Sequence, residues 1–111
     1  MATAKPLVSI GLPVYNGEKF LGRAIDSLLA QDYANIELII SNNCSTDGTG
    51  AICERFASTD SHIRYSTRER NMGASANWEW VLGQAQGAYF MWAAHDDFWK
   101  PAFVSTLVDE L

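Results

Sequence analysis

Two adjacent carboxylates, Asp96 and Asp97, follow a short apolar segment that ends at Ala94. Adjacent carboxylates repel each other, and a divalent cation bound between them and an anionic ligand relieves that repulsion. The pair therefore suggests a site for a cation that prefers oxygen ligands. The structural alternative is that the two acids cap a helix that begins near Pro101, and the pair by itself leaves both interpretations open.

Polar side chains also follow the earlier apolar segments. Tyr15 and Asn16 come after the first segment, and Asn42 and Asn43 come after the second. Side-chain amides carry both a donor and an acceptor, so the two later asparagines could bind the edge of a nucleobase, although Asx residues in loops more often form turns and caps. Arg70 could contact a phosphate. The alternative interpretation is that it is one of several solvated charges in a loop of mixed charge.

Eight segments would position these side chains, in a strand-then-helix order that repeats four times. Continuous apolar runs predict strands, and apolar residues three and four apart predict helices with one buried face. The predicted strands are 7–14, 36–41, 63–66 and 89–94, and the predicted helices are 18–31, 49–57, one from 74 to a stop at Gly87, and one that starts at Pro101. This pattern predicts an α/β fold, with a mostly parallel open sheet and helices on both faces.

Several local features refine this prediction. Asn16 is the predicted N-cap of the first helix, and Asp47 is the predicted N-cap of the second. The tryptophans are predicted to lie in the core, with Trp99 the one expected to border a site. The tryptophans are Trp78, Trp80, Trp92 and Trp99.

Ligands of open parallel sheets bind outside the carboxyl ends of the strands, which is where the polar residues above are expected. The first strand is followed by Tyr-Asn-Gly, and no glycine-rich dinucleotide turn or P-loop motif occurs in the sequence. Neither a dinucleotide site nor a P-loop is therefore predicted.

Composition limits the classes of function. The chain has 111 residues and a net charge of -5, which predicts at most one domain and argues against nucleic acid as a partner. Cys44 and Cys53 have no metal-binding spacing and are too few for a disulfide framework, so a reducing compartment is expected. No stretch approaches the length of a membrane span or has the form of a signal peptide, so we expect a cytoplasmic protein.

Three segments together resemble, in order and spacing, the nucleotide-sugar-binding half of the family 2 glycosyltransferases, which have the GT-A fold. The resemblance covers about residues 7–111. It implies a Rossmann-like GT-A half-domain that takes part in transferring a sugar, with inversion, from a nucleoside-diphosphate sugar. The segments are VSIGLPVYNGEKFLGRAIDSLLAQDYANIELIISNNCSTDGT, RNMGASANW and GAYFMWAAHDDFWKP.

The resemblance also implies roles for single residues. Asp97 would ligate Mg²⁺ or Mn²⁺, which holds the diphosphate, and Asp96 would lie beside the ribose or share the cation. Pro13, Tyr15 and Asn16 would line the pocket for the base and the ribose. The full set of predicted nucleotide-binding residues is Pro13, Tyr15, Asn16, Asn42, Asn43, Arg70 and Asp96.

Three positions depart from the pattern that the resemblance implies. Asn42 stands where the family often has an aspartate that reads the base, so the identity of the base stays open. Ala94 replaces the first acid of a D-x-D-D motif. Ala76 stands where a basic residue often precedes Asn77, so neutralising the phosphates would depend on the metal and on Arg70.

The remaining expectations concern the rest of the protein. The resemblance places the general base and the acceptor-binding segment beyond Leu111, so we expect residues 1–111 to be one partial, C-terminally truncated domain without transfer activity of its own. The acceptor is expected to be a saccharide or a lipid-linked molecule of a cell-envelope polysaccharide, reached at the cytoplasmic face of the membrane. Self-association through the open sheet edge is a further expectation. Two alternatives are a non-catalytic nucleotide-binding module and a protein-interaction module.

Overall fold

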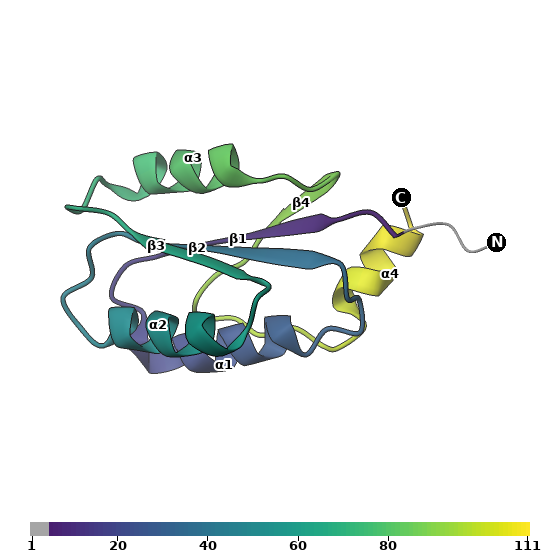
Figure 1. Ribbon diagram of the computed structural model, residues 1–111, viewed down its shortest axis with the longest axis horizontal. Helices are drawn as coiled ribbons and strands as arrows, with labels where there is room; N and C mark the ends of the chain where they lie inside the picture. The colour runs from purple at the N-terminus through teal and green to yellow at the C-terminus, as the bar shows by residue number, and fades with distance from the viewer. Residues whose placement is uncertain (1–4) are drawn as a thin grey trace.

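Strands and helices alternate along the whole chain. A computed structural model describes residues 5–111 (Figure 1). The strands are β1 (Val8–Val14), β2 (Ile36–Asn42), β3 (Ile63–Thr67) and β4 (Tyr89–Trp92). The helices are α1 (Glu18–Leu29), α2 (Thr49–Thr59), α3 (Ala74–Gln84) and α4 (Phe103–Asp109).

The four strands form one sheet in the order β3-β2-β1-β4, and every pair in it is parallel. Every residue of the two central strands is buried, which agrees with their largely apolar sequences. The edge strands β3 and β4 are shorter and only partly buried. The core therefore lies around β1 and β2.

Helices cover both faces of this sheet. Figure 1 shows α1 and α2 on one face and α3 on the other, and α4 lies at the end of the sheet near the chain termini. On α1, a stripe of Leu21, Ile25 and Leu28 is fully buried against the sheet. This arrangement confirms the predicted α/β fold with a parallel sheet and helices on both faces.

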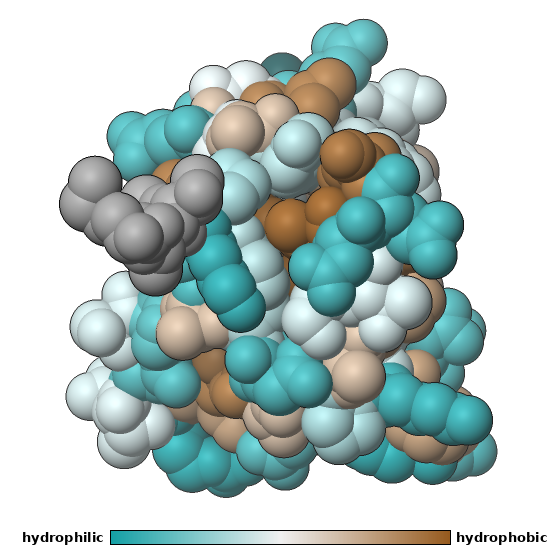
Figure 2. Space-filling view, turned by 90° about the vertical axis from the view of Figure 1, so that its right-hand side faces the viewer, coloured by the Kyte–Doolittle hydropathy of each residue, from teal (hydrophilic) through white to brown (hydrophobic). Residues whose placement is uncertain are grey.

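The end of the molecule near the termini exposes both polar and apolar side chains. Viewed from this end, patches of hydrophobic surface lie between hydrophilic groups (Figure 2). The exposed apolar residues of α4 include Phe103 and Leu107. Within residues 5–111, no helix has the length and hydropathy that a membrane crossing requires.

The element ends differ from the predictions by a few residues, and two of these differences bear on the site. Helix α1 ends at Leu29, and its N-cap is Gly17, so the predicted cap at Asn16 is wrong. Strand β4 stops at Trp92, which pairs with Gly11, although the amide of Ala93 still donates to the Gly11 carbonyl. The apolar run up to Ala94 therefore extends past the ladder into the loop that carries the acidic pair.

A buried carboxylate, Glu37 on β2, anchors the connection between α3 and β4. Its Oε2 accepts hydrogen bonds from Ser9 Oγ at 2.6 Å and from the Gln86 amide at 2.7 Å. Its Oε1 accepts from Arg64 Nη1 at 2.8 Å. Burial raises the pKa of Glu37, but these donors outweigh it, and the net effect holds the pKa below its ordinary value. Glu37 is therefore expected to be ionised in the folded protein at neutral pH.

Because the folded pKa of Glu37 is depressed, its charge stabilises the fold above the ordinary Glu pKa of about 4.3, and this contribution is lost as the pH falls through the lower folded value. We expect Glu37→Gln to lower the free energy of unfolding at neutral pH by about 1–3 kcal/mol, since its amide cannot accept from all three donors. Urea denaturation from neutral to acidic pH measures this. The difference between variant and parent should shrink in acid, and a constant difference would contradict the prediction.

Candidate functional site

The main candidate site is an open cavity of about 420 Å³ at the carboxyl ends of the strands. The chain passes from β1 to β2 on one side, whereas β4 pairs with the other side of β1. The sheet order therefore reverses between β1 and β4, and open α/β sheets bind ligands in the crevice beyond such a switch point. The cavity lies in this crevice.

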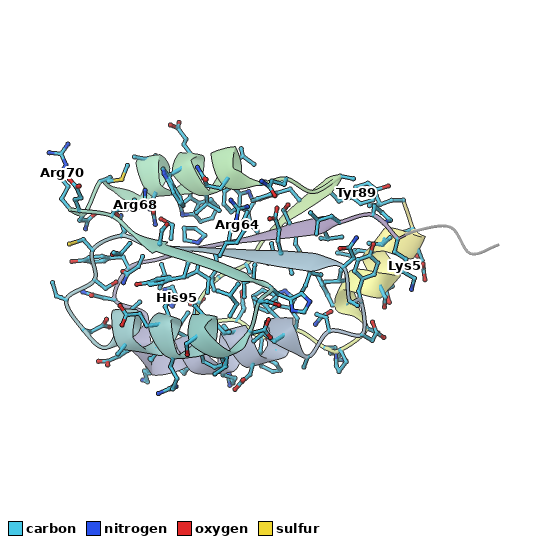
Figure 3. The ribbon with its side chains drawn as sticks, viewed as in Figure 1. Lys5, Arg64, Arg68, Arg70, Tyr89 and His95 are labelled. Carbon is cyan, nitrogen blue, oxygen red and sulfur yellow. The ribbon has the colours of Figure 1, made fainter. Side chains whose placement is uncertain are left out.

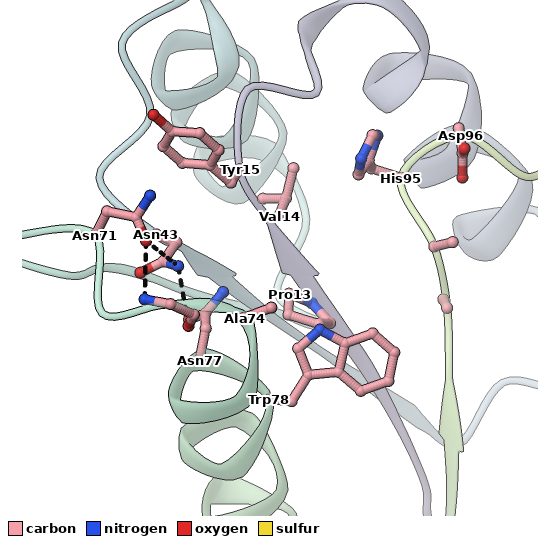
Figure 4. A pocket seen from close by; sticks show the side chains of 13 residues that line it. Pro13, Val14, Tyr15, Asn43, Asn71, Ala74, Asn77, Trp78, His95 and Asp96 are labelled. Carbon is pink, nitrogen blue, oxygen red and sulfur yellow. Dashed lines mark hydrogen bonds between the residues drawn. The ribbon is translucent and has the colours of Figure 1, made fainter.

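The cavity wall comes from the ends of three strands and the start of α3 (Figure 4). Four predicted binding residues lie in it, namely Pro13, Tyr15, Asn43 and Asp96. The predicted residues Asn16, Asn42, Arg70 and Asp97 are not among its lining residues. The complete lining is Pro13, Val14, Tyr15, Asn43, Asn71, Gly73, Ala74, Asn77, Trp78, Ala93, Ala94, His95 and Asp96.

Asn16 connects two loops beside the cavity. Its backbone has a φ of 49°, a left-handed conformation that asparagine tolerates better than most residues. Its side-chain Oδ1 accepts from the Thr46 amide at 2.8 Å, and its backbone amide donates to Ser45 Oγ at 2.9 Å. Asn16 therefore connects the loop after β1 to the loop after β2 through both its side chain and its backbone.

The first turns of α1 and α2 are capped by each other's acidic residues. Glu18 Oε2 accepts from the Gly48 amide at 3.0 Å, and Asp47 Oδ2 accepts from the Glu18 amide at 3.3 Å. Asp47 Oδ1 also accepts from the Thr49 amide. The N-cap of α2 is Gly48, so the predicted cap at Asp47 is one residue too early. Burial raises the pKa of Asp47, but the bonds from Thr49 and Glu18 outweigh it and hold the pKa below its ordinary value. We call these contacts the crossed caps.

The two asparagines after β2 have different surroundings. Asn42 Nδ2 donates to the Tyr65 hydroxyl at 3.1 Å, and Asn42 Oδ1 accepts from the Ser45 amide. Asn43 lines the cavity, where its Nδ2 donates to Asn71 Oδ1 at 3.0 Å and its Oδ1 accepts from the Met72 amide at 2.9 Å. Both side chains thus hold loops in place, and Asn43 does so at the cavity wall.

Helix α3 brings to the cavity two residues that sequence reasoning missed. Asn77 is buried, and hydrogen bonds satisfy its side-chain amide. Its Oδ1 accepts from Ser41 Oγ at 2.6 Å, and its Nδ2 donates to the Ser41 carbonyl. Trp78 is 45% exposed and lies against Trp92 with ring centroids 4.5 Å apart. Its predicted place in the core is therefore wrong, and its indole forms a wall of the cavity (Figure 4).

The arginines of the loop after β3 lie outside this cavity. Arg68 stacks on Trp80, 3.6 Å from the ring centroid, and its Nη2 donates to Ser66 Oγ. Arg70 is exposed at the tip of the loop (Figure 3) and lines a separate hollow with Asn71 and Met72. None of the lining residues that the structure describes for the main cavity is a lysine or an arginine.

The acidic pair lies in the turn after β4, where the Asp97 amide donates to the Ala94 carbonyl at 3.3 Å. Both carboxylates are exposed. Over residues 5–111 no group of three or more His, Cys, Asp or Glu side chains is arranged to hold a metal ion. Mg²⁺ and similar ions are often held by one or two carboxylates together with the phosphates of the ligand, so the exposed pair fits such an ion when a diphosphate is present.

Comparison with known proteins gives a family match over most of the chain. The family model described as glycosyl transferase family 2 matches residues 9–111. The chain is 36% identical over 104 residues to Glycosyltransferase GlyA of Streptococcus pneumoniae, covering 94% of this chain and 15% of the relative. It is 37% identical over 100 residues to the putative teichuronic acid biosynthesis glycosyltransferase TuaG of Bacillus subtilis, covering 90% of this chain and 40% of TuaG. The chain thus spans less than half of either relative.

Solved structures share the fold. Residues 1–349 of TarS from S. aureus, in complex with UDP, match with a TM-score of 0.82 and 28% identity, over 93% of this chain and 32% of that one. The mannosyltransferase PcManGT from Pyrobaculum calidifontis, in complex with GDP-Man and Mn²⁺, matches with a TM-score of 0.82 and 26% identity. That match covers 96% of this chain and 31% of PcManGT.

Proposed function

Because this chain belongs to glycosyl transferase family 2, we propose that its switch-point cavity binds the nucleoside diphosphate of a nucleotide-sugar donor. The observation that carries the proposal is that the ends of β1 and β4 meet in one cavity, with Tyr15 on one side and Asp96 on the other. Similar proteins have been solved with UDP and with GDP-Man, which supports a ligand of this class.

The two sides of the cavity suit different parts of such a ligand. Tyr15 and Asn71 stand together on one side, where an aromatic face and the side-chain Nδ2 of Asn71 would contact a nucleobase (Figure 4). Asp96 stands on the other side, where its carboxylate would accept hydrogen bonds from ribose hydroxyls. Asn43 fixes the loop that carries Asn71 and would act through it.

A divalent cation, Mg²⁺ or Mn²⁺, completes the proposal. Asp97 would ligate it, and Asp96 would share it or bind the ribose. The chain has a net charge of -5, and the described lining holds no lysine or arginine, so little else would offset the charge of a diphosphate. When bound, the cation stabilises the charge of the departing diphosphate as a Lewis acid.

For the whole protein we propose inverting transfer of the sugar to a saccharide or lipid-linked acceptor of the cell envelope. The name of TuaG refers to teichuronic acid biosynthesis, which supports an envelope polysaccharide. The chain spans a minority of each relative, so the acceptor site and general base are assigned to the remainder of such proteins.

Isothermal titration calorimetry with UDP and with GDP tests the binding. We expect at least one of them to bind in the presence of Mn²⁺ or Mg²⁺ and to bind at least about tenfold more weakly after EDTA treatment, because the carboxylates would then face the phosphates without a cation between them.

The same titrations separate the alternatives. Equal affinity with and without the cation would remove the metal from the proposal. Failure of both nucleotides to bind under every condition would contradict nucleotide binding and favour a protein-interaction module. A binding-only module would bind the nucleotide, but the full-length parent would not transfer sugar from it to any envelope acceptor.

A further inference from the structure

His95, the residue after Ala94 in the loop that follows β4, lines the cavity beside Asp96. Its imidazole packs on Gly17 at the start of α1. A Cβ atom at position 17 would lie 2.8 Å from both Cγ and Nδ1 of this ring, which is closer than such atoms approach. The missing side chain at Gly17 therefore makes the room in which the ring lies.

The surroundings of the ring leave one of its two nitrogens available to a ligand. Nδ1 is buried and has no hydrogen-bond partner among residues 5–111. Nε2 forms no hydrogen bond with residues 5–111 and is not among the buried polar atoms that lack a partner, so it is accessible on a residue that lines the cavity. A hydrogen on Nδ1 would be a buried donor without an acceptor, which costs more than a buried lone pair. The hydrogen is therefore placed on Nε2, where it can be donated to a ligand.

We propose that His95 binds the diphosphate of the ligand, with Nε2–H donating to a phosphate oxygen. This inference rests on the proposed function and adds a residue to it. The side-chain donors of the cavity that residues 5–111 leave free include the Tyr15 hydroxyl, Asn71 Nδ2, Trp78 Nε1 and His95 Nε2, and of these His95 directly precedes the acidic pair.

The choice of a phosphate over a hydroxyl follows from the neighbouring groups. The carboxylate of Asp96 is a strong acceptor for hydroxyl groups, whereas it offers nothing to a phosphate oxygen. In the absence of lining lysines or arginines, the imidazole N–H is the donor that this side of the cavity can offer to an anion. Hydrogen bonds to a charged oxygen are also roughly twice as strong as neutral ones.

The test compares the nucleoside, the monophosphate and the diphosphate of whichever base the unsubstituted chain binds, at one fixed pH with Mn²⁺ and again after EDTA treatment. His95→Phe keeps a ring against Gly17 and removes the donor. We expect it to weaken diphosphate affinity about tenfold and leave nucleoside affinity unchanged, while His95→Gln, which keeps an N–H group, recovers part of the loss. An equal loss for nucleoside and diphosphate, or no loss at all, would overturn the inference.

A second variant moves the ring without changing it. Gly17→Ala should displace the imidazole and weaken diphosphate binding, and in a His95→Ala background the same substitution should weaken it much less. The Val14 side chain, whose Cγ2 would also lie 2.8 Å from the added Cβ, is present in both backgrounds. Thermal melts confirm that each variant is folded, and additive losses in the double variant would overturn the role of His95. If the unsubstituted chain binds the diphosphate and either test fails, this inference alone is wrong. If the unsubstituted chain binds no diphosphate, the proposed function is wrong as well.

Discussion

Replacing Asp97 with asparagine is expected to remove most of the metal-dependent nucleotide binding of this chain while leaving its fold intact. The substitution keeps the size of the side chain and removes the negative charge that would hold the cation. Loss of a metal ligand should weaken diphosphate affinity in the presence of Mn²⁺ by at least about tenfold, close to the loss that EDTA treatment causes. Because Asp97 is exposed, the free energy of unfolding should change by less than about 0.5 kcal/mol.

Two matched variants control this experiment. Asp109→Asn removes an exposed carboxylate from α4 and should affect neither binding nor stability. Asp96→Asn should weaken binding of the nucleoside as well as of the diphosphate, because Asp96 lines the cavity and Asp97 does not. If Asp97→Asn unfolds the chain but leaves the response to Mn²⁺ unchanged, its role is structural and the metal ligand is assigned wrongly.

The second large effect is expected at Gly87, in the connection that leads into β4. A Cβ atom there would lie 2.6 Å from the Leu7 carbonyl oxygen and 2.8 Å from the Ser9 amide nitrogen. Both are backbone atoms of the β1 segment, so they cannot move aside as a flexible side chain would. We expect Gly87→Ala to reduce the free energy of unfolding by about 3 kcal/mol, measured by urea denaturation.

Gly83→Ala is the matched control, since it makes the same chemical change four residues earlier. Gly83 is exposed on α3, and no atom lies within 4 Å of its added Cβ. Alanine favours a helix over glycine, so this variant should be about 0.5–1 kcal/mol more stable than the parent. Equal effects of the two substitutions would show that β4 can shift away from β1 at little cost.

Much of the fold could be predicted because apolar runs and apolar periodicity, which mark strands and helices, can be recognised within a single short segment of sequence. The runs at β1 and β2 are mostly apolar, and strands buried on both faces have that pattern. The predicted cap at Asn16 was wrong because its side-chain Oδ1 accepts from the Thr46 amide, thirty residues away in the sequence. Such a tertiary contact leaves no periodic signal in either segment.

The candidate site was less predictable than the fold. Placing ligands at strand ends led to Pro13 and Asp96, both of which line the cavity. Trp78 was assigned to the core because it is apolar, but Asn77 takes the buried position and turns the indole outward. The spacing of Asn77 and Val81 marks the buried face of α3 once a buried asparagine is allowed. No signal marked His95, because its role depends on the space left by Gly17.

The crossed caps have a consequence for local unfolding. Opening the loop after β1 removes the Glu18 carboxylate from Gly48, and opening the loop after β2 removes Asp47 from the Glu18 amide. Opening the loop after β1 therefore uncaps α2, and opening the loop after β2 uncaps α1. Their amide protons should share one opening free energy in hydrogen exchange, as a single cooperative unit. Tyr15, at the edge of the cavity, precedes Asn16, which is bonded to Ser45 and Thr46 about thirty residues further along the chain. The rigidity of this edge therefore depends on those two hydrogen bonds.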